Sequence, residues 1–408
     1  MFTVTPVGSR ALEPLAPSAS TERLDQEGES RAERPNKGKA MPDDIVPILV
    51  TIIPELRKVV VEPDRVIAAS VSISTSLIGP IFRSKSFPQN VFPAFLELVY
   101  QLSRLPNNQK AWKKELSDAF LDPRFFYSAP ALVKEKWVPL QRQYLLTDRD
   151  RMMELLSRIT PPTTAGVLFG VGAASARQEA DRKTALNLKR IAFLIFAAEQ
   201  DAFVPKLSEL EEKLVELLSA TAVSSPSSAT RGEVYLVLRA VALRTSPVHL
   251  SPLWPLVNSE LTAALRALAP DGDPEKTFND ASILQACKLL DTLLVLSPDE
   301  FQLHEWLFVT DTIEAVDHPA DWNPMALADQ VVLDMPGGRS REYGGGKGGR
   351  KSWFGDEETK GEDREVIAEF LRGLSIATYE GTYGMERPDL EGVEGVFVGD
   401  LFGEVPVA

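Results

Sequence analysis

Cysteine is almost absent from the sequence: the 408 residues include one, Cys287. A single thiol cannot form a disulfide within the chain, which fits a reducing compartment. The first residues lack the continuous apolar segment of a secretory signal, and no run of about 18 apolar residues is free of polar interruption. We therefore expect no secretory leader and no transmembrane helix.

Histidine is scarce as well, and the residue clusters that support catalysis are missing. His249, His304 and His318 do not lie near another His, a Cys or a pair of acids at metal-binding spacing. The glycine-rich segment 166–172 lacks the Gly-Lys-Ser/Thr ending of a phosphate-binding loop, and no Gly-x-Ser-x-Gly motif occurs. We therefore expect an inter-helix loop at 166–172, a core role for Cys287, and a protein that is not an enzyme and holds no metal or cofactor.

The net charge of −14 argues against general nucleic-acid binding. The charge is unevenly placed, because Ser103–Arg190 holds 16 basic and 9 acidic residues whereas Asp334–Ala408 holds 9 basic and 16 acidic ones. Two interpretations are open: the basic middle contacts the acidic end of the chain, or it faces an anionic surface.

The clearest structural pattern is a pair of apolar runs around a short turn at 279–316. In the first run, apolar residues recur three or four positions apart, as on one face of a buried helix: Ile283, Leu284, Cys287, Leu290 and Leu294. The turn Ser297-Pro298-Asp299-Glu300 predicts a capping box with Ser297 as N-cap. A second stripe follows at Leu303, Trp306, Val309, Ile313 and Val316. So short a turn predicts two antiparallel helices.

Similar runs fill most of the chain and indicate an all-α protein without a convincing strand. Helices are expected at 63–78 (ended by Gly79-Pro80), 90–105, 108–120, 129–146, 148–159, 173–198, 203–220, 230–244 and 252–268, and 45–61 is expected to form two short helices or one kinked helix. About a dozen helices in antiparallel pairs predict a HEAT- or armadillo-like α-solenoid, although no fixed sequence period is visible.

The predicted organisation has five parts. They are a disordered segment at 1–41, a first part of the helical array at 42–160, a loop at 161–172, a second part of the array at 173–330, and a Gly-rich linker with an acidic tail at 331–408. The tail includes one amphipathic helix at 362–379. The leucine-rich face within 203–220 is expected to join the core, with a homodimer contact as the alternative.

Two sets of residues are candidate contact sites. The first is the basic beginning of the helix at 173–198, with Arg177, Arg182, Lys183, Lys189 and Arg190. It is either a solvated face paired with neighbouring acids or a contact for anionic lipid headgroups or an acidic partner. The second is a docking motif of the tail, with Trp353, Phe354, Phe370 and Leu371, where no local core is expected. Trp112, Trp254 and Trp306 lie on apolar stripes and predict core packing.

Six segments together resemble the C-terminal region of the Dopey (DopA) family, especially its filamentous-fungal members. They are ISTSLIGPIFRSKSFP, FLELVYQLSRLPNNQKAWKKELSDAFLDPRFF, DRMMELLSRITPPTTAGVLFGVGAASARQEADRK, SSPSSATRGEVYLVLRA, TSPVHLSPLWPLVNSEL and LQACKLLDTLLVLSPDEFQLHEWLFVTDTIEAV. The resemblance extends from about Pro63 to Trp322, whereas Met1–Met41 and the chain after Pro336 do not carry it.

The resemblance implies a function that the residues alone do not. Dopey proteins are very large, cytoplasmic, peripheral membrane proteins of the Golgi and endosomes, and they act in endosome-to-Golgi transport and in cell polarity and development. Their partners are a Mon-type, Sec7-related scaffold and a phospholipid flippase of the type IV P-type ATPase class. We therefore expect a non-enzymatic interaction module of a trafficking scaffold. The alternatives are a module that binds anionic lipid directly and, less favoured, an unrecognised enzyme.

Overall fold

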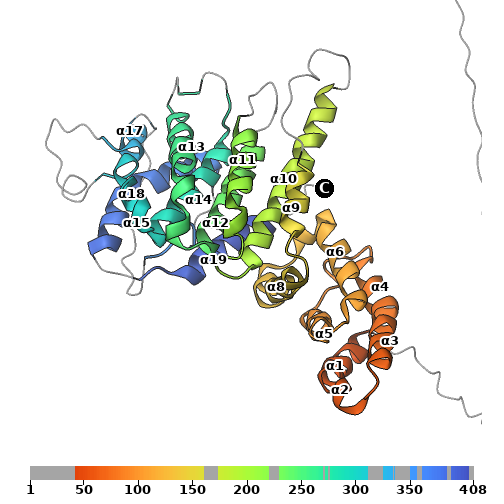
Figure 1. The fold of residues 1–408 in the computed structure, drawn as a ribbon. Coiled ribbons are helices and arrows are strands. Elements are labelled where there is room, and N and C mark those ends of the chain that lie inside the picture. Colours follow the sequence, from red (N-terminus) through yellow and green to blue (C-terminus); the bar gives the residue numbers. More distant parts are fainter. Residues whose placement is uncertain are drawn as a thin grey trace, which may run out of the picture. The chain divides into compact units, whose positions relative to one another are not determined.

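The structure, a computed structural model, describes residues 42–159, 173–219, 229–269, 272–273, 276–310, 325–333, 335, 350–355, 361–383 and 387–403. By its contacts the chain divides into Met1–Met41 and Pro42–Ala408, and all described residues belong to the second unit. Their secondary structure is helical apart from one isolated bridge between Arg350 and Pro388 (Figure 1). The predicted all-α class is confirmed for these residues. The predicted disordered segment at 1–41 and the loop at 161–172 lie outside them.

The first helices confirm the predicted break at Pro54. Helix α1 (Pro42–Ile52), a 3₁₀ turn and α2 (Leu56–Val59) replace a single helix, because proline lacks an N–H and its ring clashes with the preceding turn. Next come α3 (Pro63–Ile73), a π-helical turn η2 (Ser74–Ile78) and α4 (Gly79–Phe82). The predicted stop at Gly79-Pro80 is therefore wrong: Pro80 occupies one of the first two positions of α4, where its missing N–H costs little.

One stretch of described helix differs from the expectation for membrane segments. Pro63–Phe82 is a continuous helical segment of 20 residues that is long and apolar enough to cross a bilayer by length and composition. Its four serines and one threonine interrupt the apolar run but are only mildly polar, so the run does not stand out in the sequence. Here α3 packs on the 3₁₀ turn η3 (Gln109–Ala111) and α4 packs on α6 (Lys113–Leu121).

The middle of the chain follows the predicted pattern. Helix α5 (Pro93–Ser103) packs on both α1 and α8 (Val138–Thr147). Between α6 and α8 come η4 (Pro123–Tyr127), α7 (Pro130–Leu132) and a π-helical turn η5 (Val133–Trp137), and α9 (Arg151–Ser157) and the long α10 (Ala173–Ala197) follow.

Helices α10, α12 (Ala229–Arg244) and α14 (Asp280–Leu296) pack side by side in chain order (Figure 1). Helices α11 (Leu207–Leu218) and α13 (Trp254–Arg266) pack against α12 and α14, respectively. The leucines of α11 that face inward are buried: Leu210, Leu214, Leu217 and Leu218. They therefore belong to the core, as the preferred interpretation predicted.

The predicted capping box at Ser297 is wrong. Ser297 instead ends α14 in the left-handed conformation, with φ 46°, and its N–H donates to the Leu293 carbonyl at 2.7 Å. The capping box lies at the start of α14, where the Asn279 side chain accepts from the Ser282 N–H at 2.8 Å and the Asn279 N–H donates to Ser282 Oγ at 3.1 Å. In sequence, the Ser297-Pro298 turn is compatible with the start of a helix and with the end of one. The local residues therefore did not distinguish the two roles.

The second predicted helix of this pair is short. It comprises α15 (Asp299–Gln302) and a 3₁₀ turn, η10 (Glu305–Leu307). The stripe predicted from Leu303 onward is therefore broken. Trp306 is 58% exposed rather than buried, whereas Trp112 and Trp254 lie in the core as predicted. Residues 311–316 lie outside the described part of the chain.

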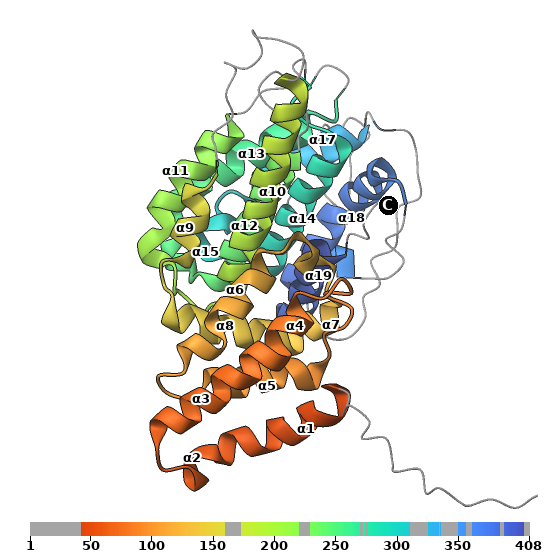
Figure 2. The same cartoon turned by 90° about the vertical axis from the view of Figure 1, so that its right-hand side faces the viewer.

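The described residues after 349 are folded, which corrects the prediction of a tail for them, whereas the predicted Gly-rich linker lies mostly outside the described residues. The predicted helix at 362–379 is present as α18 (Asp363–Tyr383), and it packs on α14 and on α17 (Leu327–Leu333). A further helix, α19 (Leu390–Phe402), lies against α12 and α14 and reaches η4 and α7 (Figure 2). Three glycines weaken the helical pattern of α19 in the sequence. Burial of its apolar side chains overrides that low propensity.

Phe402 connects this last helix to the first half of the chain. Its ring lies 5.5 Å from Phe125, 5.3 Å from Phe126 and 5.4 Å from Phe193, between ring centroids. Aromatic rings at such distances pack favourably, edge to face or offset. One core therefore includes η4, α10 and α19, which are far apart in the sequence.

Replacing Phe402 by Ala should lower the free energy of unfolding by about 3–5 kcal/mol, because a buried ring is lost and a cavity is left. Leu390→Ala, on the exposed side of α19, should change it by less than about 0.5 kcal/mol. Denaturant unfolding followed by circular dichroism measures both. Equally small effects would show that α19 does not contribute to the stability of the fold.

Candidate functional site

The strongest polar constellation holds α19 in place. Asp400 accepts a hydrogen bond from Arg239 Nη1 at 2.5 Å and another from Lys288 Nζ, so it pairs with α12 and α14 at once. Six residues earlier in the same helix, Glu394 Oε1 accepts from Arg244 Nη1 at 2.7 Å. We call these five residues the C-terminal latch.

Burial decides the electrostatics of the latch. Arg239 and Asp400 are both withdrawn from solvent. Burial alone would raise the pKa of Asp400, but the charges and hydrogen bonds of Arg239 and Lys288 outweigh it, and the pKa is lowered. A buried ion whose partner is removed is strongly destabilised, by about 3–5 kcal/mol. The latch therefore stabilises α19 in one position relative to α12 and α14, and positions in which the helix is shifted are less favourable.

A second buried acid, Asp291 of α14, lies beside the latch. It accepts hydrogen bonds from Ser352 Oγ at 2.5 Å and from the Trp353 N–H at 3.1 Å. Burial raises the pKa of Asp291 to about 6, although these hydrogen bonds and the charges of Arg239 and Lys288 act in the opposite direction. Asp291 thus fastens the turn η11 (Trp353–Gly355) to α14.

The aromatic residues assigned to tail docking lie in this region of the core. Trp353 is 4% exposed, and its ring centroid lies 5.6 Å from that of Phe370 and 4.9 Å from that of Phe354. Phe370 and Leu371 are fully buried on α18. The premise that these residues have nothing local to pack on is therefore wrong, since Trp353 packs on Phe370 of α18 and its N–H donates to Asp291 of α14. In this fold Trp353, Phe370 and Leu371 are not accessible to a partner.

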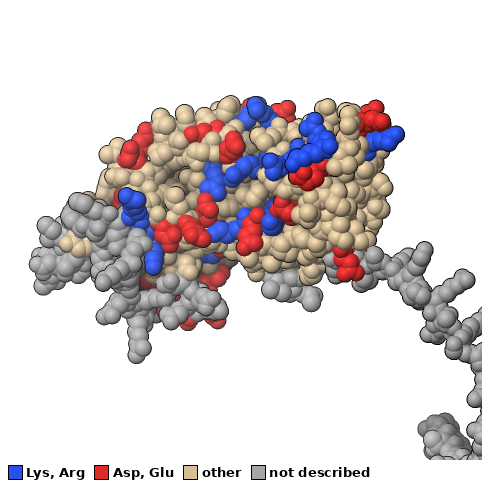
Figure 3. Space-filling view, turned by 90° about the horizontal axis from the view of Figure 1, so that it is seen from below, with Lys and Arg blue, Asp and Glu red and all other residues tan. Residues whose placement is uncertain are grey.

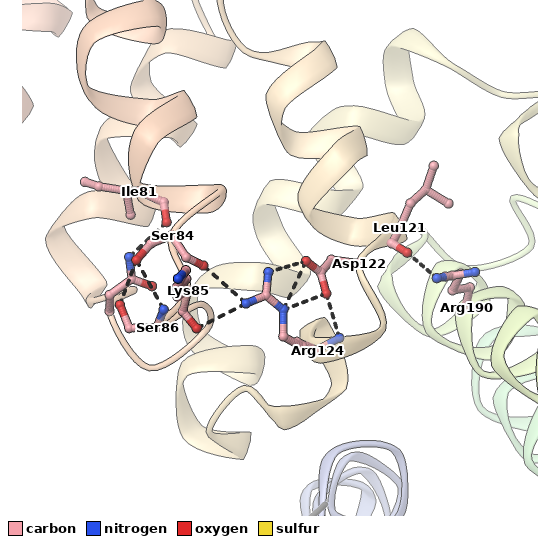
Figure 4. Close-up of polar contacts among 9 residues, drawn as sticks. Ile81, Ser84, Lys85, Ser86, Leu121, Asp122, Arg124 and Arg190 are labelled. Atoms are coloured by element: carbon pink, nitrogen blue, oxygen red, sulfur yellow. Dashed lines mark hydrogen bonds and ion pairs between the residues drawn. The ribbon is translucent and has the colours of Figure 1, made fainter.

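The basic residues predicted on α10 separate into two groups. Arg190 is buried: its Nη1 donates to Asn187 Oδ1 at 2.9 Å, and its Nη2 donates to the Leu121 carbonyl at the end of α6 (Figure 4). Burial lowers the pKa of Arg190 to about 10, with the charges of Arg158 and Arg151 acting in the same direction. A guanidinium on the last carbonyls of a helix is a structural cap.

Lys189 is also buried, and its Nζ lies 3.5 Å from Glu233 Oε1 on α12. Arg177 is half-buried. Only Arg182 and Lys183 are well exposed, at 65% and 69% of their side chains, and they share Glu179 at 2.9 and 3.5 Å. These two residues are thus paired with an acid of their own helix, and the choice between a solvated face and a contact for an anionic surface stays a prediction. The spacing of the basic residues in the sequence does not show which of them lie against buried neighbours. All five were therefore predicted on one surface.

Charges of both signs are mixed on the face shown in Figure 3, where Lys and Arg lie among Asp and Glu. One hollow of about 580 Å³ is formed where α8, α10, α12 and α19 meet, and its lining includes Arg142, Arg244 and Glu394. Arg142 Nε donates to the Ala197 carbonyl at 3.0 Å, and Arg244 Nε donates to the Phe196 carbonyl at 2.7 Å. The guanidinium groups of Arg142 and Arg244 therefore bind carbonyl groups at the end of α10.

Catalytic chemistry has little support in the described residues. No three His, Cys, Asp or Glu side chains within them are grouped so that they could hold a metal. Burial raises the pKa of Cys287, with the charge of Asp291 acting in the same direction, so the thiolate that a nucleophile needs is disfavoured. His318 is outside the described residues.

Stacked helices with a shared core, and polar side chains that join one helix to another, define an all-α protein built as a helical array. Within that class the chain belongs to the DOP1, or Dopey, family, because the family model for the DOP1 C-terminal region matches residues 12–384. The match extends beyond the region of resemblance at both ends, and it includes α18.

Relatives from fungi and animals agree with this assignment. Protein dop1 of Emericella nidulans is 45% identical over 381 residues, which are 90% of this chain and 20% of that protein. Protein DOP1B of Mus musculus is 30% identical over 259 residues, which are 56% of this chain and 10% of that protein. The chain thus spans a fifth or less of the length of these relatives. No solved structure matches it.

Asp291→Asn should change how stability depends on pH. The folded pKa of about 6 exceeds the ordinary value of 3.8, so Asp291 favours the folded state most when it is protonated. That contribution is complete below pH 3.8 and is lost as pH rises through about 6, which amounts to about 3 kcal/mol. Asparagine cannot ionise, and its Oδ1 can still accept from the Trp353 N–H.

The stability of the variant relative to the natural chain should therefore rise by about 3 kcal/mol between about pH 4 and pH 7. Denaturant unfolding at several pH values measures the difference, and Asp64→Asn on the exposed side of α3 controls for the change in charge. A difference that stays constant with pH would contradict the burial of an acid at this position.

Proposed function

We propose that this chain is a non-enzymatic interaction module of a membrane-trafficking scaffold that acts in endosome-to-Golgi transport and in cell polarity or development. Membership of the DOP1 family supports the proposal. The helical array supports it as well, because stacked helices with a common core present a stable surface to other proteins. The module would work by holding partners together, without making or breaking bonds.

The partners we propose are a Mon-type, Sec7-related scaffold and a type IV P-type ATPase phospholipid flippase, and the location is the cytoplasmic side of Golgi and endosome membranes. One observation carries the assignment of a protein-binding surface. Trp306 is exposed, yet its Nε1 donates to the Leu303 carbonyl at 3.0 Å, so the ring is held in place. Leu303 is exposed beside it. Pre-positioned tryptophans often dominate the binding energy of protein interfaces.

Trp306→Ala should weaken binding of the full chain to the purified Mon-type scaffold by at least about thirtyfold in Kd, or about 2 kcal/mol, if Trp306 is an anchor. Interferometry with immobilised chain measures the affinity. Val248→Ala, which removes another exposed apolar side chain, should leave it unchanged. If the natural chain binds neither proposed partner and is diffuse in cells when tagged, the proposed function is wrong.

Direct binding of anionic lipid is the second candidate, and the exposure of Arg182 and Lys183 on α10 favours it. Each basic side chain near an anionic membrane contributes about 1 kcal/mol, and salt screens that contribution. Reversing both charges (Arg182→Glu with Lys183→Glu) should therefore reduce sedimentation with phosphatidylserine vesicles by at least about tenfold.

Lys58→Glu with Arg65→Glu is the matched control, because these two residues are equally exposed and are paired with acids in the same way, 2.6 Å from Glu55 and Glu62. Arg190 is left unchanged, since its substitution would remove the cap on α6. Sedimentation that is the same for the natural chain and the double variant, or that is insensitive to salt, would exclude this candidate.

A further inference from the structure

Helix α1 has two apolar faces. Its inner face is buried, with Val46 in the core, and the helix packs on α5. Its outer face carries Ile45, Ile48 and Ile52, three and four residues apart, and all three are exposed, Ile48 by 58%. A surface helix normally has one apolar stripe and an opposite polar face. The second stripe is therefore a feature that the described fold does not use.

The exposed apolar surface continues past α1. Val59 at the end of α2 and Val61 in the turn before α3 are among the most exposed large apolar residues in the described part of the chain. Scattered apolar residues on a surface need no explanation, but a helical stripe of three isoleucines followed by two valines does. Figure 2 shows α1 and α2 at one end of the described helices, next to α3 and α5.

The charges around this surface favour a protein helix over a membrane. The segment 42–65 contains five acidic residues (Asp43, Asp44, Glu55, Glu62 and Asp64) and three basic ones (Arg57, Lys58 and Arg65), so its net charge is −2. Lys58 and Arg65 are also paired with Glu55 and Glu62, each at 2.6 Å. An anionic bilayer would repel such a segment.

Repeat arrays normally finish with a terminal layer whose outer face is polar. Helix α1 has instead the two-sided apolar pattern of an inner layer. The matched region of the relatives is described as C-terminal and makes up 20% of the Emericella nidulans protein. In such relatives further chain therefore precedes the helices that correspond to α1.

We infer that the outer face of α1 is a packing surface for a further helical layer, namely an amphipathic helix with its own aliphatic stripe, which the preceding chain supplies in the longer DOP1 proteins. The isoleucine stripe would insert between the side chains of that helix, as layers pack within the array. This inference rests on family membership and does not depend on the proposed trafficking function.

A chimera tests the inference by thiol labelling. The entire chain of the Emericella nidulans relative up to the residue aligned with Met41 is joined to Pro42 of this protein, and Ile48→Cys is placed in both the chimera and the 408-residue chain. Labelling at position 48 should be at least about tenfold slower in the chimera, because it then requires local separation of the layers. The natural Cys287 is fully buried and contributes little background.

Val248→Cys is the control, since that exposed position lies outside α1 and outside the surface around Trp306, and it should react at the same rate in both proteins. Equal labelling rates at position 48 would overturn the inference. Protection of position 48 in the 408-residue chain that grows with protein concentration would assign the face to a second copy, and protection by vesicles would assign it to lipid; either result also overturns it.

A second measurement does not need the chimera. Ile48→Asp should leave the Tm of the 408-residue chain within about 2 °C of its natural value, because the side chain is exposed. Asp at the aligned position of the full-length Emericella nidulans protein should lower the Tm of the transition that includes this region, because a charge would then be buried without a partner. An unchanged Tm in the full-length protein would contradict the inference even if the labelling result is ambiguous.

Discussion

The pairing of Asp400 with Arg239 and Lys288 is the constraint on which the arrangement of the described helices depends. A carboxylate withdrawn from water needs its cations, and both cations lie on helices of the central array. Only one position of α19 satisfies all three groups. We interpret the latch as determining which position α19 occupies more than as adding net stability. The reason is that desolvation offsets much of the attraction within a buried ion pair.

With α19 held in this position, its apolar side chains complete the core in two directions. Phe402 reaches the phenylalanines of η4 and α10, while Phe397 packs on Phe196 with ring centroids 4.9 Å apart. Trp353 and Phe370 fill the space beside α14. The end of the chain therefore stabilises contacts among helices that were predicted to form two separate parts of an array. The apolar side chains that stay exposed on α1 and at Trp306 take no part in this core.

Local sequence was a good guide where one physical signal acted alone. Apolar spacing located α5, α10, α12 and α13 to within a few residues, and Pro54 marked a real break. It failed where two signals competed. Ser297 fits an N-cap by its side chain, yet its position after a complete helical stripe makes it the end of α14. At Gly79-Pro80 the helix continues, since the preceding π-helical turn and α4 accommodate the proline.

The sequence by itself determined the helical class and most helix positions, because these follow from periodicity and from residues that are close in the chain. It also indicated the family, through the resemblance of six segments to known members. Only the tertiary structure decided that Arg190 and Lys189 are buried while Arg182 and Lys183 face water, and that the glycine-containing end of the chain is a core helix. Both outcomes depend on partners that are far away in the sequence: Leu121 and Glu233 in the first case, Arg239 and Phe125 in the second. Burial and charge pairing across such distances leave no local signal.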